Sequence, residues 1–305
     1  FGLLNAIEHI ANEQQKQFIY TEILNGKRLS NGGPERNTKD TRTIETHLEQ
    51  INGQYLLNGE KFYSTGSYFA DWLAIRAIHP DGHIVLTIID AKAEGVEIVD
   101  DWDGFGQRTT ASGTVRLKNV VVHPDLIIDE KPLADASKYR GAYSQLIQVA
   151  IDVGIAEAAF ADTLSAIHKA RPIIDANVDK ASFEAYTLQE VGKLNILLDA
   201  SILLLDEAAE YLNELDSQDI VSPEQASKAS IIVAEAKVYA NDAALLISEK
   251  LLELGGSRSS LATHNLDQHW RNARVHTLHD PVRWKLHAIG NYYLNGTQNQ
   301  RHAWI

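Results

Sequence analysis

The feature that most constrains the fold is the order in which three kinds of sequence follow one another along the chain. Residues 1–24 mix Leu, Ile, Ala, Gln and Glu without a breaker after Gly2, which is typical of a helix. From Thr41 to about Val122, short β-branched and aromatic runs are cut by Asn-Gly and Asp-Gly pairs, which are strong turn signals. After Pro132, long Ala-, Leu- and Glu-rich segments have apolar residues at helical spacing. Few folds place a β domain between helices and a helical bundle.

This order predicts an α+β protein with three parts. We expect residues 1–40 to be a remnant of an N-terminal helical domain, 41–130 to form a central antiparallel β domain of about eight short strands, and 131–305 to form a C-terminal helical bundle. The bundle helices are expected near 140–170, 186–215, 223–254, 264–275 and 281–294.

Two of these helices carry start signals. Ser222 is the expected N-cap of the third helix, with Pro223 at its first position and Gln225 completing a capping box. The last helix is expected to start with Asp280 as its N-cap and Pro281 at its first position.

The composition narrows the function classes. With 41 acidic and 28 basic residues, the net charge of -13 disfavours nucleic acid and anionic membranes as partners. No apolar run reaches the roughly 20 residues of a membrane span, so a soluble, cytoplasmic protein is expected.

The absence of Cys excludes thiolate nucleophiles, iron–sulfur clusters and cysteine-ligated zinc. No glycine-rich dinucleotide or phosphate loop is present. The absence of Met suggests that residues are missing from the sequence.

The densest group of chemically useful side chains spans residues 269–281. His276 and His279 are three residues apart, so they share one face if the helix persists, and Asp280 lies beside them. Two histidines and a carboxylate are suitable metal ligands, but this spacing is common by chance and we expect no metal here. Residue type alone favours a structural interpretation, in which Asp280 caps a helix and the histidines lie on a half-buried face.

Two further segments combine glycines with polar and aromatic side chains. Residues 59–66 predict a strand that runs into a turn carrying Tyr63, Ser64 and Thr65, which could face either a heterocycle or water. Residues 102–113 are too polar for a core strand and too rich in Gly for a helix, so we expect a loop that binds a ligand or caps a domain.

Together these segments resemble the acyl-CoA dehydrogenase superfamily, in which a β domain between two helical domains holds a flavin. Residues 59–72 are similar to the strand and turn under the flavin ring, and 254–258 to a Gly-Gly turn that meets the cofactor of a neighbouring subunit. Residues 271–281 align with the stretch whose end normally carries a catalytic Glu followed by Gly. This chain has Asp280-Pro281 there, preceded by His279.

One branch of the superfamily shares this departure. Residues 279–281, with the motifs at 63–66 and 102–113, are similar to the flavin monooxygenases of the branch that contains dibenzothiophene monooxygenases and sulfur-acquisition oxidoreductases. The resemblance covers nearly all of the chain from Asn31 onward and implies further helices ahead of Phe1. It implies a monooxygenase that uses O2 on a small apolar substrate, with organosulfur compounds among the candidates, through a C4a-hydroperoxyflavin.

The resemblance also implies roles for individual residues. His279 is the expected proton donor or shuttle beside the flavin, with His276 as its support. Ser64 is expected to serve both catalysis and flavin binding. The remaining expected cofactor-binding residues are Asn31, Tyr63, Thr65, Arg171 and, from a neighbouring subunit, Arg258 and Ser259.

A shared cofactor site implies a homo-oligomer, in this fold a tetramer. The flavin is expected to be FMN rather than FAD, supplied reduced by a separate flavin reductase. Two alternatives remain open at this point. One is a flavin-dependent acyl-CoA dehydrogenase or nitroalkane-oxidase-like enzyme with Asp280 as base, and the other is a flavin-binding or structural homologue without activity.

Overall fold

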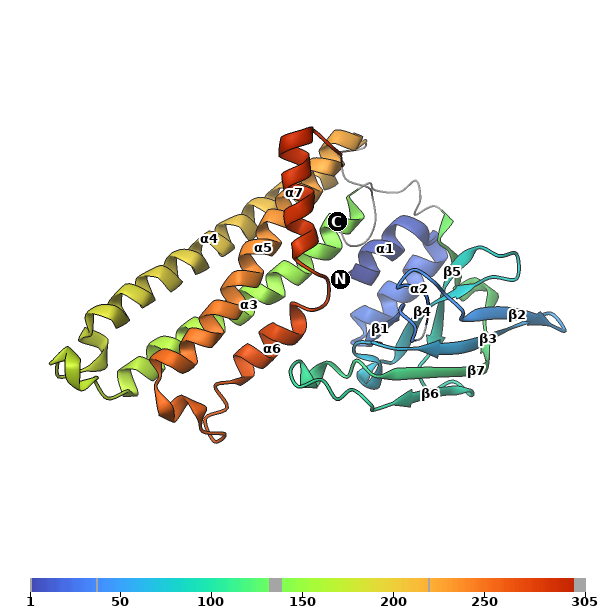
Figure 1. The fold of residues 1–305 in the computed structure, drawn as a ribbon. Coiled ribbons are helices and arrows are strands. Elements are labelled where there is room, and N and C mark those ends of the chain that lie inside the picture. The colour runs from blue at the N-terminus through green and yellow to red at the C-terminus, as the bar shows by residue number, and fades with distance from the viewer. Residues whose placement is uncertain (1, 37, 132–138, 219, 299–305) are drawn as a thin grey trace. The chain divides into compact units, whose positions relative to one another are not determined.

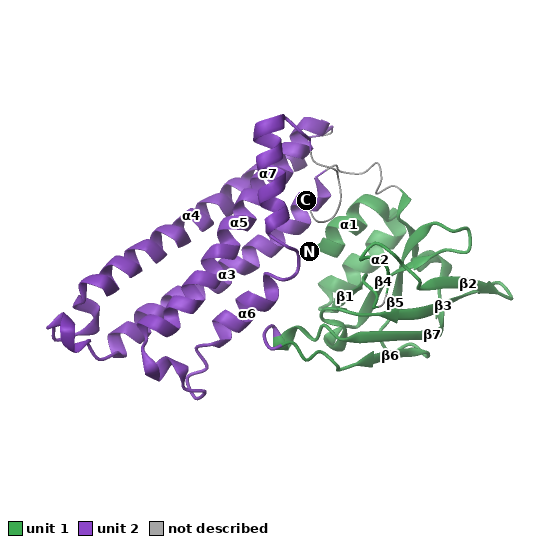
Figure 2. Ribbon diagram, in the orientation of Figure 1, with its two compact units in different colours: residues 1–104, 108–137 green, residues 105–107, 138–305 purple. Residues whose placement is uncertain are grey.

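The computed structural model describes residues 2–36, 38–131, 139–218 and 220–298. The chain divides into two compact units (Figure 2). Unit 1 comprises residues 1–104 and 108–137, and unit 2 comprises residues 105–107 and 138–305. None of the helices in the described ranges is long and apolar enough to cross a membrane.

Unit 1 begins with two helices rather than the single helix expected over residues 1–24. They are α1 (Gly2–Ile10) and α2 (Glu13–Leu24). Asn12 separates them, because its side chain accepts a hydrogen bond from the Gln15 amide at 2.9 Å while Gln15 accepts one from the Asn12 amide at 3.0 Å. This reciprocal capping box starts a new helix within an otherwise helical sequence. Phe1 lies outside the described residues.

The rest of unit 1 is an eight-stranded sheet with the order β6-β7-β3-β2-β4-β5-β8 and with β1 beside β4 (Figure 1). The strands are β1 (Leu29–Gly32), β2 (His47–Ile51), β3 (Gln54–Lys61), β4 (Trp72–Ile78), β5 (Ile84–Asp90), β6 (Val96–Val99), β7 (Thr114–Val122) and β8 (Ile127–Asp129).

The sheet is mixed, not purely antiparallel as expected. Most neighbours are antiparallel, but β1 and β2 both pair with β4 in parallel. No tight turn joins these partners, so no local turn signal in the sequence marked the pairing. β1 also lies ahead of residue 41, where the sequence pattern first indicated strands.

Alternation along β4 explains how the sheet is covered on both faces. Leu73 and Ile75 point into a core shared with β3, β5 and β7. Ala74 points to the opposite face, where it packs with Ile7 of α1 and Ile19 of α2. Because β4 and β5 are buried on both faces, their sequences are largely apolar instead of alternating, with Arg76 and Thr87 as the polar residues inside the runs.

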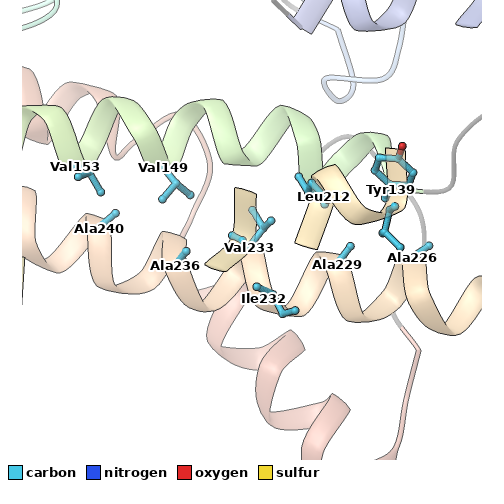
Figure 3. Close-up of a cluster of buried hydrophobic side chains, with 13 residues drawn as sticks. Tyr139, Val149, Val153, Leu212, Ala226, Ala229, Ile232, Val233, Ala236 and Ala240 are labelled. Carbon is cyan, nitrogen blue, oxygen red and sulfur yellow. The ribbon is translucent and has the colours of Figure 1, made fainter. Parts of the chain in front are cut away.

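Unit 2 is a helical bundle in which α5 is the central element. Its helices are α3 (Arg140–Lys169), α4 (Ala185–Asp216), α5 (Pro223–Leu254), α6 (Gln268–His276) and α7 (Arg283–Asn295). The capping box at the start of α5 is as expected, with Ser222 and Gln225 exchanging hydrogen bonds of 3.2 and 2.8 Å. Figure 3 shows the cluster in which Ala236 and Ala240 of α5 face Val149 and Val153 of α3.

Candidate cofactor and active site

The turn that follows β3 is held in an unusual backbone conformation. Tyr63 has a φ of 59°, a left-handed value that bulky residues rarely adopt. Main-chain hydrogen bonds fix the turn to the 102–113 loop: the Ser64 amide donates to Gly113 at 3.1 Å, and the Gly66 amide donates to Thr110 at 2.8 Å. A strained conformation of this kind persists only where its surroundings determine it, and it is common at functional sites.

The three side chains expected to meet the flavin ring lie together in this turn. Ser64 is fully buried, and its hydroxyl has no hydrogen-bond partner among the described residues. The Thr65 hydroxyl lies 2.9 Å from that of Ser112. Tyr63 is 55% exposed and meets Trp102 edge to face. An unpartnered buried hydroxyl is unusual and fits a site that a ligand completes.

Asn31 lies on β1, next to this turn, and is exposed. Its neighbour Ser30 donates a hydrogen bond to the Thr65 carbonyl at 2.8 Å, which places Asn31 beside the turn. The segment after β1 is anchored by Lys61, whose Nζ lies 2.5 Å from Glu35 and donates to the Gly33 carbonyl at 3.2 Å. Burial lowers the pKa of Lys61, while the charge of Glu35 opposes that shift.

In unit 2, a cavity of about 220 Å³ lies between the end of α3 and the turn after α5. Its charged and polar lining includes Asp162, Lys169, Arg258, Ser259 and His264. Arg258 forms no ion pair with the part of the chain that the structure describes. Two cationic side chains, Lys169 and Arg258, line the cavity with the single carboxylate of Asp162, so the lining carries excess positive charge. Guanidinium and ammonium groups of this kind fit a phosphate.

Two other residues were expected at the phosphate, and one of them, Ser259, also lines the cavity. The Ser259 hydroxyl donates to the carbonyls of Leu252 and Gly256 at 2.7 and 2.6 Å, so it closes the turn that presents Arg258. Arg171 is exposed beyond the end of α3 and is not among the residues that line the cavity.

Residues 105–107 of the expected loop pack on α6 within unit 2. The Gln107 amide donates to the Asn272 side chain at 2.8 Å, and Phe105 stacks on Trp270. A Cβ atom at Gly106 would lie 1.9 Å from the Arg271 carbonyl oxygen, so only glycine allows this approach. The contact fixes α6 just ahead of its last residue, His276.

His276 is held by a buried charge cluster. Its Nδ1 lies 2.5 Å from one carboxylate oxygen of Asp152, and the other oxygen lies 2.7 Å from Nζ of Lys237. The side chains of Asp152 and Lys237 are at most 1% exposed. The Nε2 atom of His276 is buried without a hydrogen-bond partner among the described residues. The arrangement supports a positioning role for His276.

The residues after α6 differ from the expectation. The helix ends at His276, so His276 and His279 do not share a helical face; the His276 side chain is 11% exposed and that of His279 is 49% exposed. Asp280 is not the N-cap of α7, which begins at Arg283 after Val282. The carboxylate instead turns inward to Lys285, 3.0 Å away, because that buried ammonium needs a counter-charge.

The contacts of Asp280 with His279 and Lys285 determine its acidity. Burial raises its pKa, but the hydrogen bond with His279 and the charge of Lys285 outweigh burial and hold the pKa at about 2. Burial lowers the pKa of Lys285 despite the opposing charge of Asp280. Asp280 is therefore a weak base, while the neighbouring His279 imidazole remains half exposed.

Comparisons with known proteins agree with this architecture. Residues 34–120 match the middle domain of acyl-CoA dehydrogenases, and residues 146–284 match their C-terminal domain. A dibenzothiophene monooxygenase of Rhodococcus qingshengii is 32% identical over 97% of this chain and 75% of its own length. The chain belongs to the acyl-CoA dehydrogenase superfamily. Within this superfamily it belongs to the flavin-dependent monooxygenase branch, as the sequence motifs predicted.

Two further members of the superfamily are similar over most of this chain. A probable FMNH2-dependent monooxygenase of Pseudomonas putida is 29% identical over 86% of this chain and 67% of its own length. The crystal structure of TdsC from Paenibacillus sp. A11-2, in complex with FMN and indole, superposes with a TM-score of 0.92. That alignment covers all of this chain and 80% of TdsC, at 29% identity.

Sequence reasoning missed the charged residues behind the histidines. Asp152, Lys237 and Lys285 come from three helices, and no motif joins them. Lys237 had a detectable signal, because it lies four residues after Val233 and three before Ala240 on the apolar face of α5. Asp152 had the same signal in α3, three residues after Val149 and four before Ala156. A charge in such a row predicts a buried partner.

Proposed function

We propose that this member of the acyl-CoA dehydrogenase superfamily is a reduced-FMN-dependent monooxygenase that acts with O2 on a small apolar substrate, with organosulfur compounds as the first class to test. The observation that carries this proposal is the state of Asp280, which stands where the superfamily's dehydrogenases have a catalytic base. Its contact with Lys285 and its pKa of about 2 leave it poorly suited to abstract a proton.

FMN rather than FAD is the proposed cofactor, and it would supply the electrons with which O2 is activated. Tyr63, Ser64 and Thr65 would border its ring, where the Ser64 hydroxyl lacks a partner. Asn31 would lie at the edge of this pocket. The similarity to FMN-bound TdsC supports the choice of cofactor.

The phosphate is proposed to bind at the cavity near Arg258, with the turn closed by Ser259. Arg171 is proposed to contribute from the exposed segment after α3. We further propose that the cavity of one subunit serves the flavin of its neighbour.

His279 is the proposed catalytic residue. Its imidazole would donate or shuttle a proton beside the flavin, since an imidazole can do either near neutral pH. His276 would position His279, because its contact with Asp152 fixes the end of α6, and the chain turns from that end to His279. The burial of Asp152 and Lys237 keeps this support rigid.

The proposed assembly is a homotetramer. In support, α4 exposes large apolar side chains along its length: Tyr186, Ile196 and Leu203 are 83%, 70% and 68% exposed. A separate flavin reductase would provide reduced FMN, because the sequence has no nicotinamide-binding motif. Free reduced flavin oxidises readily in air, so the reductase and the monooxygenase need to act in the same compartment, and we propose the cytoplasm. We also propose a role in sulfur metabolism.

The competing proposal is an acyl-CoA dehydrogenase or nitroalkane-oxidase-like enzyme with Asp280 as base. One experiment separates the two proposals: the protein is mixed anaerobically with reduced FMN and dibenzothiophene, then exposed to isotopically labelled O2. Labelled oxygen in the sulfoxide or sulfone supports the monooxygenase. Anaerobic bleaching of oxidised flavin by an acyl-CoA or nitroalkane, with no labelled product, would overturn it. Tight FMN binding with neither reaction would indicate a binding protein.

A further inference from the structure

The hairpin between β4 and β5 brings two histidines together. Its sequence is His79-Pro80-Asp81-Gly82-His83. The His79 amide donates to the His83 carbonyl at 2.8 Å, and the Gly82 amide donates to the His79 carbonyl at 2.7 Å. Gly82 takes a φ of 86°, which allows this tight turn. As a result, the two imidazole rings lie with their centroids 4.7 Å apart.

Asp81 adds a carboxylate to the two imidazoles. Its Oδ2 lies 3.2 Å from Nδ1 of His79, and one potential ligand atom from each of His79, Asp81 and His83 lies within 4.8 Å of the other two. The imidazole side chains are 15% and 19% exposed, whereas Asp81 is 77% exposed. The rings are therefore fixed by packing, and the exposed carboxylate can turn from His79 toward a ligand.

We propose that this hairpin binds one divalent late-transition-metal ion, of the class of Zn²⁺, through His79, Asp81 and His83. Nitrogen donors select such ions over Mg²⁺ and Ca²⁺, which prefer oxygen. Zinc ligands lie about 2.0–2.2 Å from the metal, so donor atoms about 3–4 Å apart suit its coordination. Three protein ligands leave room for water.

The surroundings of the three ligands favour a cation. A second carboxylate, that of Asp129 on β8, lies 3.8 Å from Nε2 of His83. Tyr55 of β3 packs against His79 with ring centroids 5.6 Å apart, which restrains that imidazole. Negative charge and fixed ring orientation beside the ligands both strengthen metal binding.

The metal site is separate from the proposed flavin site within unit 1. Thr65 accepts a hydrogen bond from Ser30, which pairs with Leu73 at the amino end of β4, whereas His79 follows the carboxyl end of that strand. Seven strand residues at about 3.3 Å each put roughly 20 Å between them. A metal ion would therefore brace the hairpin and stabilise unit 1 without taking part in the proposed oxidation.

The chain contains its own matched control. His123-Pro124-Asp125 repeats the tripeptide His79-Pro80-Asp81. In both copies the Asp amide donates to Nδ1 of the His at 3.3 Å. The second copy has a carboxylate 3.6 Å from its imidazole, but no metal-ligand group among the described residues includes it.

The test is a titration of the tag-free, chelator-stripped protein with Zn²⁺ alone by calorimetry, and with Co²⁺ by absorption spectroscopy. We expect one ion per chain with micromolar affinity and a rise in Tm on Zn²⁺ addition. His79→Gln and His83→Gln each remove a ligand and should weaken binding by at least about tenfold, since loss of an outer-shell partner alone costs about 10–100-fold. Asp81→Asn, a change at an exposed position, should weaken binding without affecting folding. His123→Gln should bind as the unmodified protein does, and all variants should retain FMN affinity.

Three outcomes would overturn the proposal. The first is the absence of saturable binding of one ion per chain. The second is binding that persists unchanged when His79 and His83 are both replaced. The third is an equal loss of binding in His123→Gln, since that would assign the ion to scattered surface histidines. Circular dichroism of each variant distinguishes loss of the site from loss of the fold, and Asp81→Asn decides the matter if the histidine variants unfold.

Discussion

The Nδ1 atom of His276 lies 2.5 Å from a carboxylate oxygen of Asp152, and both side chains belong to a cluster that also contains buried Lys237. Asp152→Asn removes the counter-charge of that lysine. Breaking a buried ion pair from one side costs about 3–5 kcal/mol. We expect a loss of that size in the free energy of unfolding, measured by urea denaturation.

The matching control is Glu253→Gln, which breaks a pair with Lys250 on the surface of the same bundle. Exposed pairs contribute about 0–1 kcal/mol. Similar losses in Asp152→Asn and Glu253→Gln would contradict a structural role for the buried cluster.

His279→Ala is expected to keep FMN affinity while diverting turnover toward hydrogen peroxide. A positioned acid or base contributes about 10²–10⁴-fold to its step. His279 is half exposed and lies 3.4 Å from Asp280, so the fold should persist, with a small loss of stability because the hydrogen bond that lowers the pKa of Asp280 is removed. Oxygenated product and peroxide are measured together with reduced FMN supplied. Leu278→Ala, at the adjacent exposed residue, serves as control. If both variants divert the same share of turnover to peroxide, the role proposed for His279 is contradicted.

Ser64→Ala and Ser67→Ala form a matched pair, since both hydroxyls are buried and unpartnered among the described residues. Removing an unsatisfied hydroxyl should leave stability unchanged or raise it by about 1–3 kcal/mol. If Ser64 binds the flavin, only Ser64→Ala should also weaken FMN affinity, by about tenfold. Fluorescence titration with FMN measures this, and an unchanged affinity in Ser64→Ala would exclude the contact.

The contacts of Asp280 with His279 and Lys285 predict a pH dependence of stability. The pKa of Asp280 falls to about 2 on folding. A lowered carboxyl pKa stabilises the folded state above the unfolded pKa of about 3.9, and that contribution is lost as the pH falls toward 2. The contribution is about 2 kcal/mol.

Urea unfolding of the unmodified protein at pH 7, 4 and 3 measures this loss. The double variant Asp280→Asn, Lys285→Met carries neither charge, so its unfolding free energy should fall less over that range. Identical pH profiles for the two proteins would assign the acid sensitivity to other carboxylates.

Much of the fold could be predicted because its signals are local. Ser222 and Gln225 mark the start of α5 through contacts three residues apart, and the structure confirms them. The break at Asn12 was also encoded locally, but the surrounding helical composition hid it. The parallel pairing of β1 with β4 could not be predicted, because it joins residues about 43 apart without a turn between them.

The candidate site was predicted less completely than the fold. The turn at Tyr63 was predicted from the sequence, and the structure shows it within unit 1. The cavity beside Arg258 was not predicted, and the role of Arg258 at a phosphate stays a prediction. The prediction that Asp280 is the N-cap of the last helix was wrong. An Asp before a proline is typical of an N-cap, but the actual partner of Asp280 is Lys285, and that contact depends on how α7 packs. The charge pair with Lys285 therefore outweighed the local preference of Asp280 for an N-cap position.

The alanines that α5 turns toward α3 also bear on how such proteins diverge. Ala229, Ala236 and Ala240 are fully buried, and a larger side chain at any of them would force the helices apart. The outward residues of α4 meet no such limit within the subunit. Over evolutionary time α5 should therefore change more slowly than α4, and its small-residue pattern should be the last part of the bundle by which a distant relative can still be aligned.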